Sequence, residues 1–184
     1  MKRALAAVVM TALTASPAFA AHWTVDAAKS KLGFAVAWSN EPFVGVFRSW
    51  KADIDFDPAD LAHAHAAVTV ALASETSDSA DSDDGVKGAL GFAVDQFPTA
   101  RFETTRFSRL ADGTYLADAQ LTIRGVTKRV GLPFKLAFDG NRVHMTGKAT
   151  VDRSTFGVGQ GEWAAPTPVA YAVTVTVDLE ATKS

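Results

Sequence analysis

The side chains that most often bind metals or carry out acid–base chemistry are sparse in this chain, and their spacing fits no strong site. His63 and His65 are two residues apart, so on a strand both imidazoles would share one face and could begin a metal site. No third ligand lies nearby in the sequence, and exposed residues at the start of a strand account for the pair. We therefore expect no metal ion at these histidines.

A run of aspartates resembles a calcium loop at first sight. Asp78, Asp81, Asp83 and Asp84 lie close together, but counting from Asp81 places Phe92 where an EF-hand carries its bidentate glutamate. Helix capping and a solvated loop explain these carboxylates better.

The common catalytic and nucleotide-binding motifs are absent or incomplete. The glycine-rich segment 157–161 is followed by residues that cannot open the helix of a dinucleotide-binding fold, so we expect its glycines to permit a tight loop. The chain has no G-x-S-x-G motif and no cysteine, which excludes disulfides, thiolate metal sites and a cysteine nucleophile. We therefore expect a protein that is not an enzyme and needs no cofactor.

Four cations have the chemistry to bind a phosphate or pyrophosphate group. Arg124 and Lys128 flank a glycine turn, Arg101 follows a proline closely, and Arg153 precedes the glycine-rich segment. The alternative is a solvated charge or a salt bridge at a turn, and Arg153 beside Asp152 looks like such a structural pair. The formal net charge of −2, from 18 Lys and Arg against 20 Asp and Glu, gives little support to a nucleic-acid-binding surface.

Large apolar side chains form the other candidate functional set. On strands they either fill a core or line a cavity for a hydrophobic ligand, and aromatic residues serve both roles. Alternation places Phe43 with Phe47 on one face and Trp50 on the opposite face, so we do not expect all of them to point inward. The candidates are Phe34, Val36, Trp38, Phe43, Phe47, Trp50, Phe92, Phe97, Phe102, Phe134, Phe156 and Trp163.

The elements that must position these residues are predominantly strands. From Trp23 onward apolar residues recur at every second position, which is the pattern of a half-buried strand. The Asp-Gly pair at 112–113 is a hairpin signal. The eight predicted strands cover residues 32–39, 44–56, 64–72, 101–107, 115–123, 128–138, 143–151 and 169–179.

One stretch departs from the strand period. Ser82 is a good N-cap, the two aspartates after it suit the positive end of a helix dipole, and apolar residues from Val86 to Val94 recur at helical spacing until Pro98. We predict a short helix across one end of the sheet, weakened by its two glycines.

Eight antiparallel strands with short hairpins leave two exposed edges unless the sheet closes on itself. We therefore predict an all-β fold, an eight-stranded antiparallel β-barrel with one short helical segment. The interior of such a barrel is either filled by side chains or wide enough for a small ligand. Strands of ten residues reach roughly 33 Å, and a tall apolar tube of that length would suit an elongated hydrophobic ligand.

Residues 1–20 have the composition of a secretory signal peptide. Two cations form a basic start, an apolar run covers residues 4–13, and Ala-Phe-Ala at 18–20 fits a cleavage site. The alternative is an uncleaved anchor, although the apolar run is too short to span a bilayer. We expect cleavage after Ala20, a single domain over residues 21–184, and a soluble protein in a bacterial periplasm.

Five segments occur in a consistent order along nearly the whole chain from Trp23 to Glu180. They are Trp23-Thr24-Val25-Asp26 with Ser30-Lys31-Leu32-Gly33-Phe34, then Val44-Gly45-Val46-Phe47, Phe97-Pro98-Thr99-Ala100-Arg101-Phe102, Leu121-Thr122-Ile123-Arg124-Gly125-Val126-Thr127-Lys128 and Asp152-Arg153-Ser154-Thr155-Phe156-Gly157-Val158-Gly159. In this order they resemble the YceI family of lipocalin-like, polyisoprenoid-binding exported proteins.

The resemblance implies a lipocalin-like barrel whose lumen holds an isoprenoid chain. The protein would then be a non-catalytic carrier of a polyprenyl pyrophosphate or an isoprenoid quinone. A second hypothesis is an accessory that presents quinone to a membrane cytochrome b561-type partner, and a third is an enzyme acting on an isoprenoid substrate. Relatives are often dimers, so a homodimer is a further expectation.

Two departures from the family pattern concern the region of the head group. The stretch Asp83-Asp84-Gly85-Val86-Lys87 stands where many relatives carry an Arg-Asp-x-His sequence, and Trp38 stands where relatives often carry histidine. The comparison implies a different or less polar head group in this chain.

Overall fold

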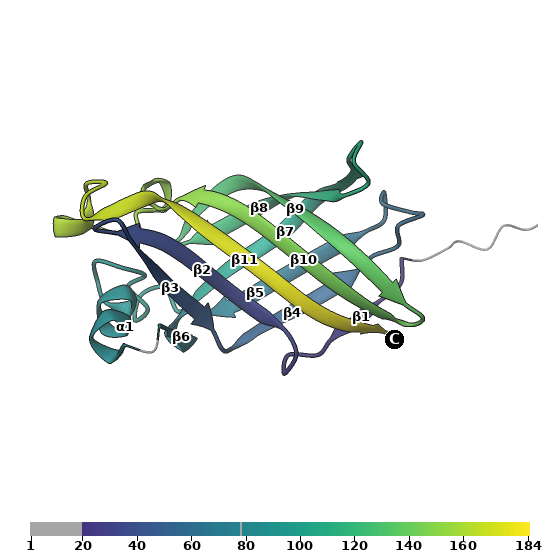
Figure 1. Cartoon of the computed structure of the whole chain (residues 1–184), viewed down its shortest axis with the longest axis horizontal. Helices are drawn as coiled ribbons and strands as arrows, with labels where there is room; N and C mark the ends of the chain where they lie inside the picture. The colour runs from purple at the N-terminus through teal and green to yellow at the C-terminus, as the bar shows by residue number, and fades with distance from the viewer. Residues whose placement is uncertain (1–19, 78) are drawn as a thin grey trace, which may run out of the picture.

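The computed structural model describes residues 20–77 and 79–184. In this part of the chain eleven strands form one sheet in the order β4-β5-β7-β8-β9-β10-β11-β2-β3-β6, with β1 paired to β11 (Figure 1). The all-β class and the antiparallel pairing are confirmed, but eleven strands replace the predicted eight. Residues 1–19 of the predicted signal peptide lie outside the described residues.

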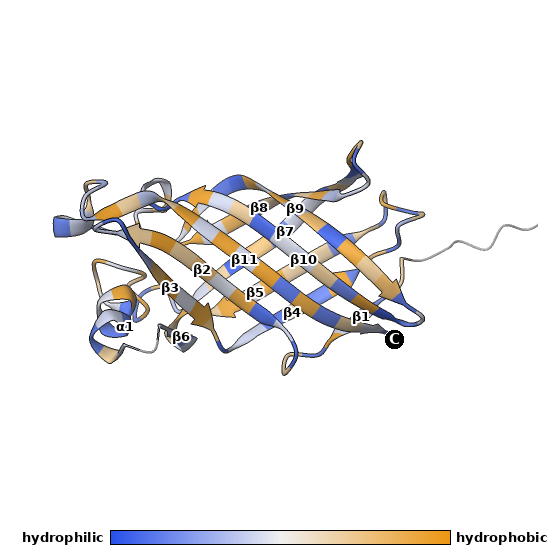
Figure 2. Ribbon diagram, in the orientation of Figure 1, coloured by the Kyte–Doolittle hydropathy of each residue, from blue (hydrophilic) through white to orange (hydrophobic). Residues whose placement is uncertain are grey.

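The longer strands alternate in polarity. Figure 2 shows hydrophobic and hydrophilic positions alternating along β10 and β11, because successive side chains of a strand point to opposite faces of the sheet. The strands are β1 (Trp23–Val25), β2 (Lys31–Trp38), β3 (Glu41–Phe47), β4 (Trp50–Asp55), β5 (His65–Ala71), β6 (Glu75–Thr76), β7 (Thr99–Arg109), β8 (Tyr115–Ile123), β9 (Val126–Asp139), β10 (Arg142–Asp152) and β11 (Val169–Lys183).

The predicted strand over residues 44–56 is wrong, because the structure divides it in two. β3 ends at Phe47 and β4 begins at Trp50. The halves pair with different neighbours, β3 with β2 and β4 with β5. This division raises the number of strands and changes which side chains share a face.

The bend between β3 and β4 is held by the chain that joins β5 to β6, the short 3₁₀ helix η1 (Leu72–Ser74). Arg48 N donates to Ser74 O at 3.2 Å, and Ala71 N donates to Ser49 O at 3.0 Å. These bonds bring the two edges of the curled sheet together at this point.

The segment around β1 joins the edges at the opposite end. β1 pairs with the last residues of β11, beyond the part of β11 that pairs with β2. His22 forms an antiparallel bridge with Asp55 of β4, and Phe56 N donates to Ala21 O at 2.8 Å. The curled sheet is therefore bridged between β4 and β11.

The helix begins and ends earlier than predicted. α1 (Ala80–Lys87) has Ser79 rather than Ser82 as its N-cap, and residues 88–98 form turns. A Cβ at Gly91 would collide with the carbonyl of Val86, so this turn depends on glycine. α1 lies at the end of the sheet away from the C-terminus (Figure 1). None of the helices in the described ranges is long and apolar enough to cross a membrane.

A buried aromatic cluster fills the interior near the chain termini. The ring of Phe56 meets Phe107, Tyr115 and Phe134 edge-on, with centroids 5.2, 5.6 and 6.0 Å away. Trp23 is buried in the same core and donates its indole N–H to Phe56 O at 2.8 Å. The rings pack closely against one another, and Phe56, Phe107 and Phe134 also border the interior cavity described below.

Candidate ligand-binding cavity

The interior of the curled sheet contains a cavity of about 320 Å³, which is within the range of small-molecule sites. Apart from tryptophan indoles, only two of the described residues on its wall have polar side chains, Thr104 and Arg153. The Thr104 hydroxyl is already bonded to the backbone of Ala66, accepting from N at 2.8 Å and donating to O at 3.2 Å. The cavity therefore offers a ligand mainly hydrophobic contact.

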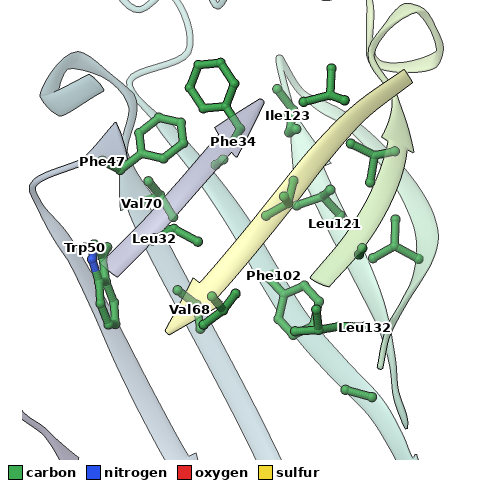
Figure 3. A pocket seen from close by; sticks show the side chains of 18 of the residues that line it. Leu32, Phe34, Phe47, Trp50, Val68, Val70, Phe102, Leu121, Ile123 and Leu132 are labelled. Atoms are coloured by element: carbon green, nitrogen blue, oxygen red, sulfur yellow. The ribbon is translucent and has the colours of Figure 1, made fainter. Parts of the chain in front are cut away.

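Eleven of the twelve apolar candidates from the sequence border this cavity. Figure 3 shows Phe34, Phe47, Trp50 and Phe102 on the wall, from strands β2, β3, β4 and β7. Aliphatic side chains fill the spaces between these rings. Those labelled in the same view are Leu32, Val68, Val70, Leu121, Ile123 and Leu132.

Phe97 is the exception, and its predicted place on the wall is wrong. The Arg124 guanidinium lies over the Phe97 ring, 5.7 Å from its centroid. A Cβ added to Gly125 would be 3.2 Å from the same ring. Phe97 therefore packs the 88–98 segment against the turn between β8 and β9, outside the cavity.

Phe47 and Trp50 both face the cavity, although strict alternation predicts opposite faces. The bend between β3 and β4 resets the alternation, so the inward set changes parity there. Val44, assigned to the face of Trp50 by alternation, is 53% exposed. In β11 a register shift between Val169 and Val173 leaves the parity of the inward residues unchanged but takes Tyr171 off the wall.

Half-buried aromatic side chains gather where α1 covers the sheet. The Trp38 ring lies 5.6 Å from that of Trp163 and 6.0 Å from that of Phe43, centroid to centroid. Trp163, from the 3₁₀ helix η3 (Gly161–Trp163), contacts α1 at Gly85. These rings form an apolar boundary between the cavity and α1.

Three of the four candidate cations, Arg101, Arg124 and Lys128, do not line the main cavity. Arg101 is exposed because its neighbour Phe102 takes the inward position on β7. Arg124 donates to Ala89 O at 3.0 Å and to Gly91 O at 2.5 Å, so its guanidinium fastens the 88–98 segment. Their role in binding a phosphate head group stays a prediction.

Lys128 borders a separate depression between β9 and β10. This second cavity, of about 260 Å³, is also lined by Arg129, Asp152 and Thr155. Val130, Val151 and Phe156 border both cavities, so they form the partition between them. A group bound at Lys128 would therefore lie outside the main cavity.

Arg153 borders the main cavity but is structural in its bonding. It is buried and donates to backbone carbonyls, and Asp152 acts on it through charge and not through a direct hydrogen bond. The Asp152 carboxylate instead accepts from Ser154, from N at 2.9 Å and from Oγ at 2.6 Å. A Cβ at Gly159 would collide with the Arg153 guanidinium, so the glycine-rich segment is the loop that receives this side chain.

A buried acid, Glu75, is the feature of this region that the sequence patterns do not indicate. It is 1% exposed, and among the described residues its two carboxyl oxygens are the only buried side-chain oxygens or nitrogens without a hydrogen-bond partner. Burial, with the nearby charge of Asp83, raises the pKa of Glu75 to about 7. Glu75 follows Ser74 and begins the two-residue strand β6. Two residues are too few to show which side chains alternate inward.

One described group of side chains has the composition of a metal site. Atoms of His22, Asp53 and Asp55 lie within 4.8 Å of one another, and none of the three residues is buried. His22 Nδ1 is 2.9 Å from Asp55 Oδ1, so an imidazole–carboxylate hydrogen bond accounts for the grouping. His63 is similarly bonded to Asp60, at 2.8 Å.

The family model described as a YceI-like domain matches residues 23–181 of this chain. The chain is a member of the YceI-like family. This confirms the resemblance carried by the five sequence segments. Relatives of this YceI-like protein include a UPF0312 protein of Ectopseudomonas mendocina, 29% identical over 144 residues that cover 76% of this chain and 75% of the relative. A UPF0312 protein of Vibrio cholerae is 25% identical over 169 residues, 86% of this chain and 89% of the relative.

Solved structures share the fold of this YceI-like protein. Burkholderia cenocepacia BcnA matches with a TM-score of 0.83 and 32% identity, over 86% of this chain and 100% of BcnA. A polyisoprenoid-binding domain from Saccharophagus degradans, implicated in plant cell wall breakdown, matches with a TM-score of 0.66 and 13% identity, over 89% of this chain and 99% of that domain. At that identity the second match concerns the fold alone.

Proposed function

We propose that this YceI-like protein is a non-catalytic carrier that holds a polyisoprenoid lipid in its cavity. The observation that carries the proposal is a deep cavity with an almost entirely apolar wall, whose two polar side chains, Thr104 and Arg153, already bond the backbone. Such a wall suits a branched hydrocarbon chain better than a sugar, nucleotide or peptide. The description of the Saccharophagus degradans relative as polyisoprenoid-binding supports the same ligand class.

The energetics favour a hydrocarbon chain in this cavity. Moving one CH₂ group from water into an apolar site contributes about 0.8 kcal/mol, and each isoprene unit has five carbons. A few buried units therefore offset the several kcal/mol that immobilising the ligand costs. Affinity then arises from the chain, and the head group adds selectivity.

A carrier role is supported over catalysis by the chemistry of the wall. A reaction would need a nucleophile, a general base or a group that stabilises developing charge close to the bound lipid. Thr104 and Arg153 are held by backbone groups, so neither is placed to act on a substrate. We also propose that the protein is exported to a bacterial periplasm, on the composition of residues 1–20.

The first experiment identifies what the purified protein carries. We expect native mass spectrometry of protein from a bacterial host to show a bound lipid, and organic extraction to release an isoprenoid compound. Trp38→Asp and Phe102→Asp should each abolish the bound mass, because each places a carboxylate on the apolar wall. Val44→Asp is the matched control, since Val44 is exposed on β3 and should leave the lipid in place.

The outcomes separate the hypotheses. Folded Trp38→Asp and Phe102→Asp variants that keep the lipid would contradict the carrier proposal. Recovery of a quinone, with binding to a membrane fraction that contains a cytochrome b561-type protein, would favour the accessory role. Turnover of the extracted lipid would favour an enzyme. The b561-type partner and the homodimer stay predictions.

A further inference from the structure

Glu75 is the buried polar group that the carrier function does not use. A carboxyl removed from water without a hydrogen bond is destabilising, so a structure that keeps one invites an explanation beyond packing. Both Glu75 oxygens lack a partner among the described residues, and the side chain is 1% exposed.

The carboxyl lies directly behind one ring of the cavity wall. In the β3–β6 pair, Glu75 of β6 is opposite Phe47 of β3. Gly45, two residues before Phe47 on β3, has no side chain. A Cβ on Gly45 would lie 2.6 Å from Glu75 Oε1 and 2.5 Å from the Phe34 ring. The carboxyl and the ring therefore share the space that Gly45 leaves, and Phe34 borders the cavity beside Phe47 (Figure 3).

We propose that Glu75 is the polar contact for the head group of the bound lipid, and that this head group is uncharged and presents a carbonyl or hydroxyl oxygen. The inference rests on the proposed carrier function and adds the class of head group. Glu75 itself is not on the wall, so the contact requires the Phe34 ring to turn aside before the carboxyl can donate its proton to the ligand oxygen.

The surrounding charges favour a neutral head group. Asp83 and Lys87 of α1 are the charged groups that act on Glu75, and the two are 4.0 Å apart, so Lys87 already has a carboxylate partner. A phosphate would bring further negative charge beside Asp83. The raised pKa of Glu75, about 7, keeps a large fraction of the carboxyl protonated near neutral pH, as a donor requires.

An anionic head group would have a different place on this molecule. Lys128 and Arg129 lie by the second cavity, across the partition that includes Phe156. Phosphate recognition would then depend on these cations and not on Glu75. The two arrangements predict different sensitive residues.

The test uses three probes with short prenyl chains: a ubiquinone with two isoprene units, farnesyl pyrophosphate, and the hydrocarbon farnesene. Binding is followed by intrinsic tryptophan fluorescence, since Trp38, Trp50 and Trp163 border the cavity. We expect the wild-type protein to bind the ubiquinone at least tenfold more tightly than farnesyl pyrophosphate. Glu75→Leu should weaken the ubiquinone about tenfold and leave farnesene unchanged.

A conservative variant gives a second readout. Glu75→Gln keeps a donor that does not titrate, so its affinity for the ubiquinone should be constant from pH 6 to 8, whereas wild-type affinity should fall as the carboxyl loses its proton. Glu103→Leu is the control, because Glu103 is exposed on the outer face of β7. If Glu75→Leu does not fold, Glu75→Gln and the pH profile decide the question.

The failure of this inference is distinct from failure of the carrier function. Unchanged ubiquinone binding in Glu75→Leu, or tighter binding of farnesyl pyrophosphate that Lys128→Ala removes, would overturn the role of Glu75 while farnesene still binds. No binding of farnesene to the wild-type protein would overturn the carrier function on which the inference depends.

Discussion

At the scale of single residues, Arg153 shows how a cation in an apolar wall is stabilised. Its guanidinium donates to Val158 O at 2.9 Å, Ala165 O at 3.1 Å, Val169 O at 2.6 Å and Ala170 O at 2.9 Å. These carbonyls come from the loop after β10 and from the start of β11, so one side chain joins two segments. Burial lowers the pKa of Arg153, but an arginine remains charged.

Arg153→Met should destabilise the protein by about 3 kcal/mol or more, because it leaves several carbonyls without donors. Arg153→Lys should recover only part of this loss, since an ammonium cannot reach all four oxygens. Urea unfolding gives the free energies, with exposed Arg129→Met as the control. A loss below about 1 kcal/mol for Arg153→Met would show that water replaces these bonds.

At the scale of elements, α1 is held to the sheet by one carboxylate. Asp83 Oδ1 accepts from Ser77 N at 2.7 Å and from Ser77 Oγ at 2.6 Å, which lowers the pKa of Asp83. α1 has only eight residues, so its stability depends on tertiary contacts such as this anchor and the packing of Trp163 against Gly85.

Asp83→Ala should loosen α1 without unfolding the sheet. Because both Ser77 bonds are lost, amide hydrogens of residues 80–87 should exchange roughly tenfold faster, while those of β7 and β8 should not change. Hydrogen-exchange mass spectrometry measures both. Asp84→Ala is the control, because Asp84 is exposed on the same helix. Equally fast exchange in both variants would contradict the role of Asp83 as an anchor for α1.

At the scale of the whole molecule, the wall of the cavity contains both tightly packed and loosely packed side chains. Phe56, Phe102 and Phe134 all border the cavity, but Phe56 and Phe134 are buried and their rings pack against each other, whereas Phe102 is only partly buried. Dispersion contacts are lost wherever a side chain faces empty space. The buried rings of the wall should therefore contribute more to stability than its partly buried side chains do.

Phe134→Ala should cost about 3–5 kcal/mol, as expected for a buried aromatic residue. Phe102→Ala should cost no more than about half as much, because fewer contacts surround that ring. Chemical denaturation of lipid-free protein compares the two variants. Equal losses would mean that the cavity collapses around Phe102 in solution.

The free energy of unfolding should also fall as the pH rises, because of Glu75. Its pKa rises from an ordinary value of 4.5 to about 7 on folding, so the native state binds the proton more tightly than the unfolded state does. The stabilisation is complete below about pH 4.5 and is lost as the pH rises to about 7. Asp83 and Asp152 have lowered pKa values, so their contribution is lost only as the pH falls below 3.8.

We expect the free energy of unfolding to be higher at pH 5 than at pH 8, by roughly 2–3 kcal/mol from Glu75. In Glu75→Gln this difference should disappear, since an amide does not titrate. Urea unfolding at both pH values measures it. A wild-type protein that is equally stable at pH 5 and pH 8 would contradict the raised pKa.

The strands follow from local alternation where nothing distant intervenes. The prediction for Tyr115–Ile123 matches β8 at both ends, and the inward face of β2 agrees with the predicted set that contains Phe34 and Trp38. Alternation succeeds here because each side chain's face depends only on its position in the strand. The apolar wall was therefore largely visible in the order of the residues.

The tertiary structure decided what local order cannot encode. The bend after Phe47 depends on Ser74, which is distant in sequence, and the end of α1 depends on turns that Arg124 holds from another hairpin. Two of the expected phosphate-binding arginines, Arg124 and Arg153, donate to backbone carbonyls that are distant in sequence, which their sequence surroundings do not indicate. Tertiary packing also encloses Glu75, because burial is a property of the packed chain and not of a two-residue strand.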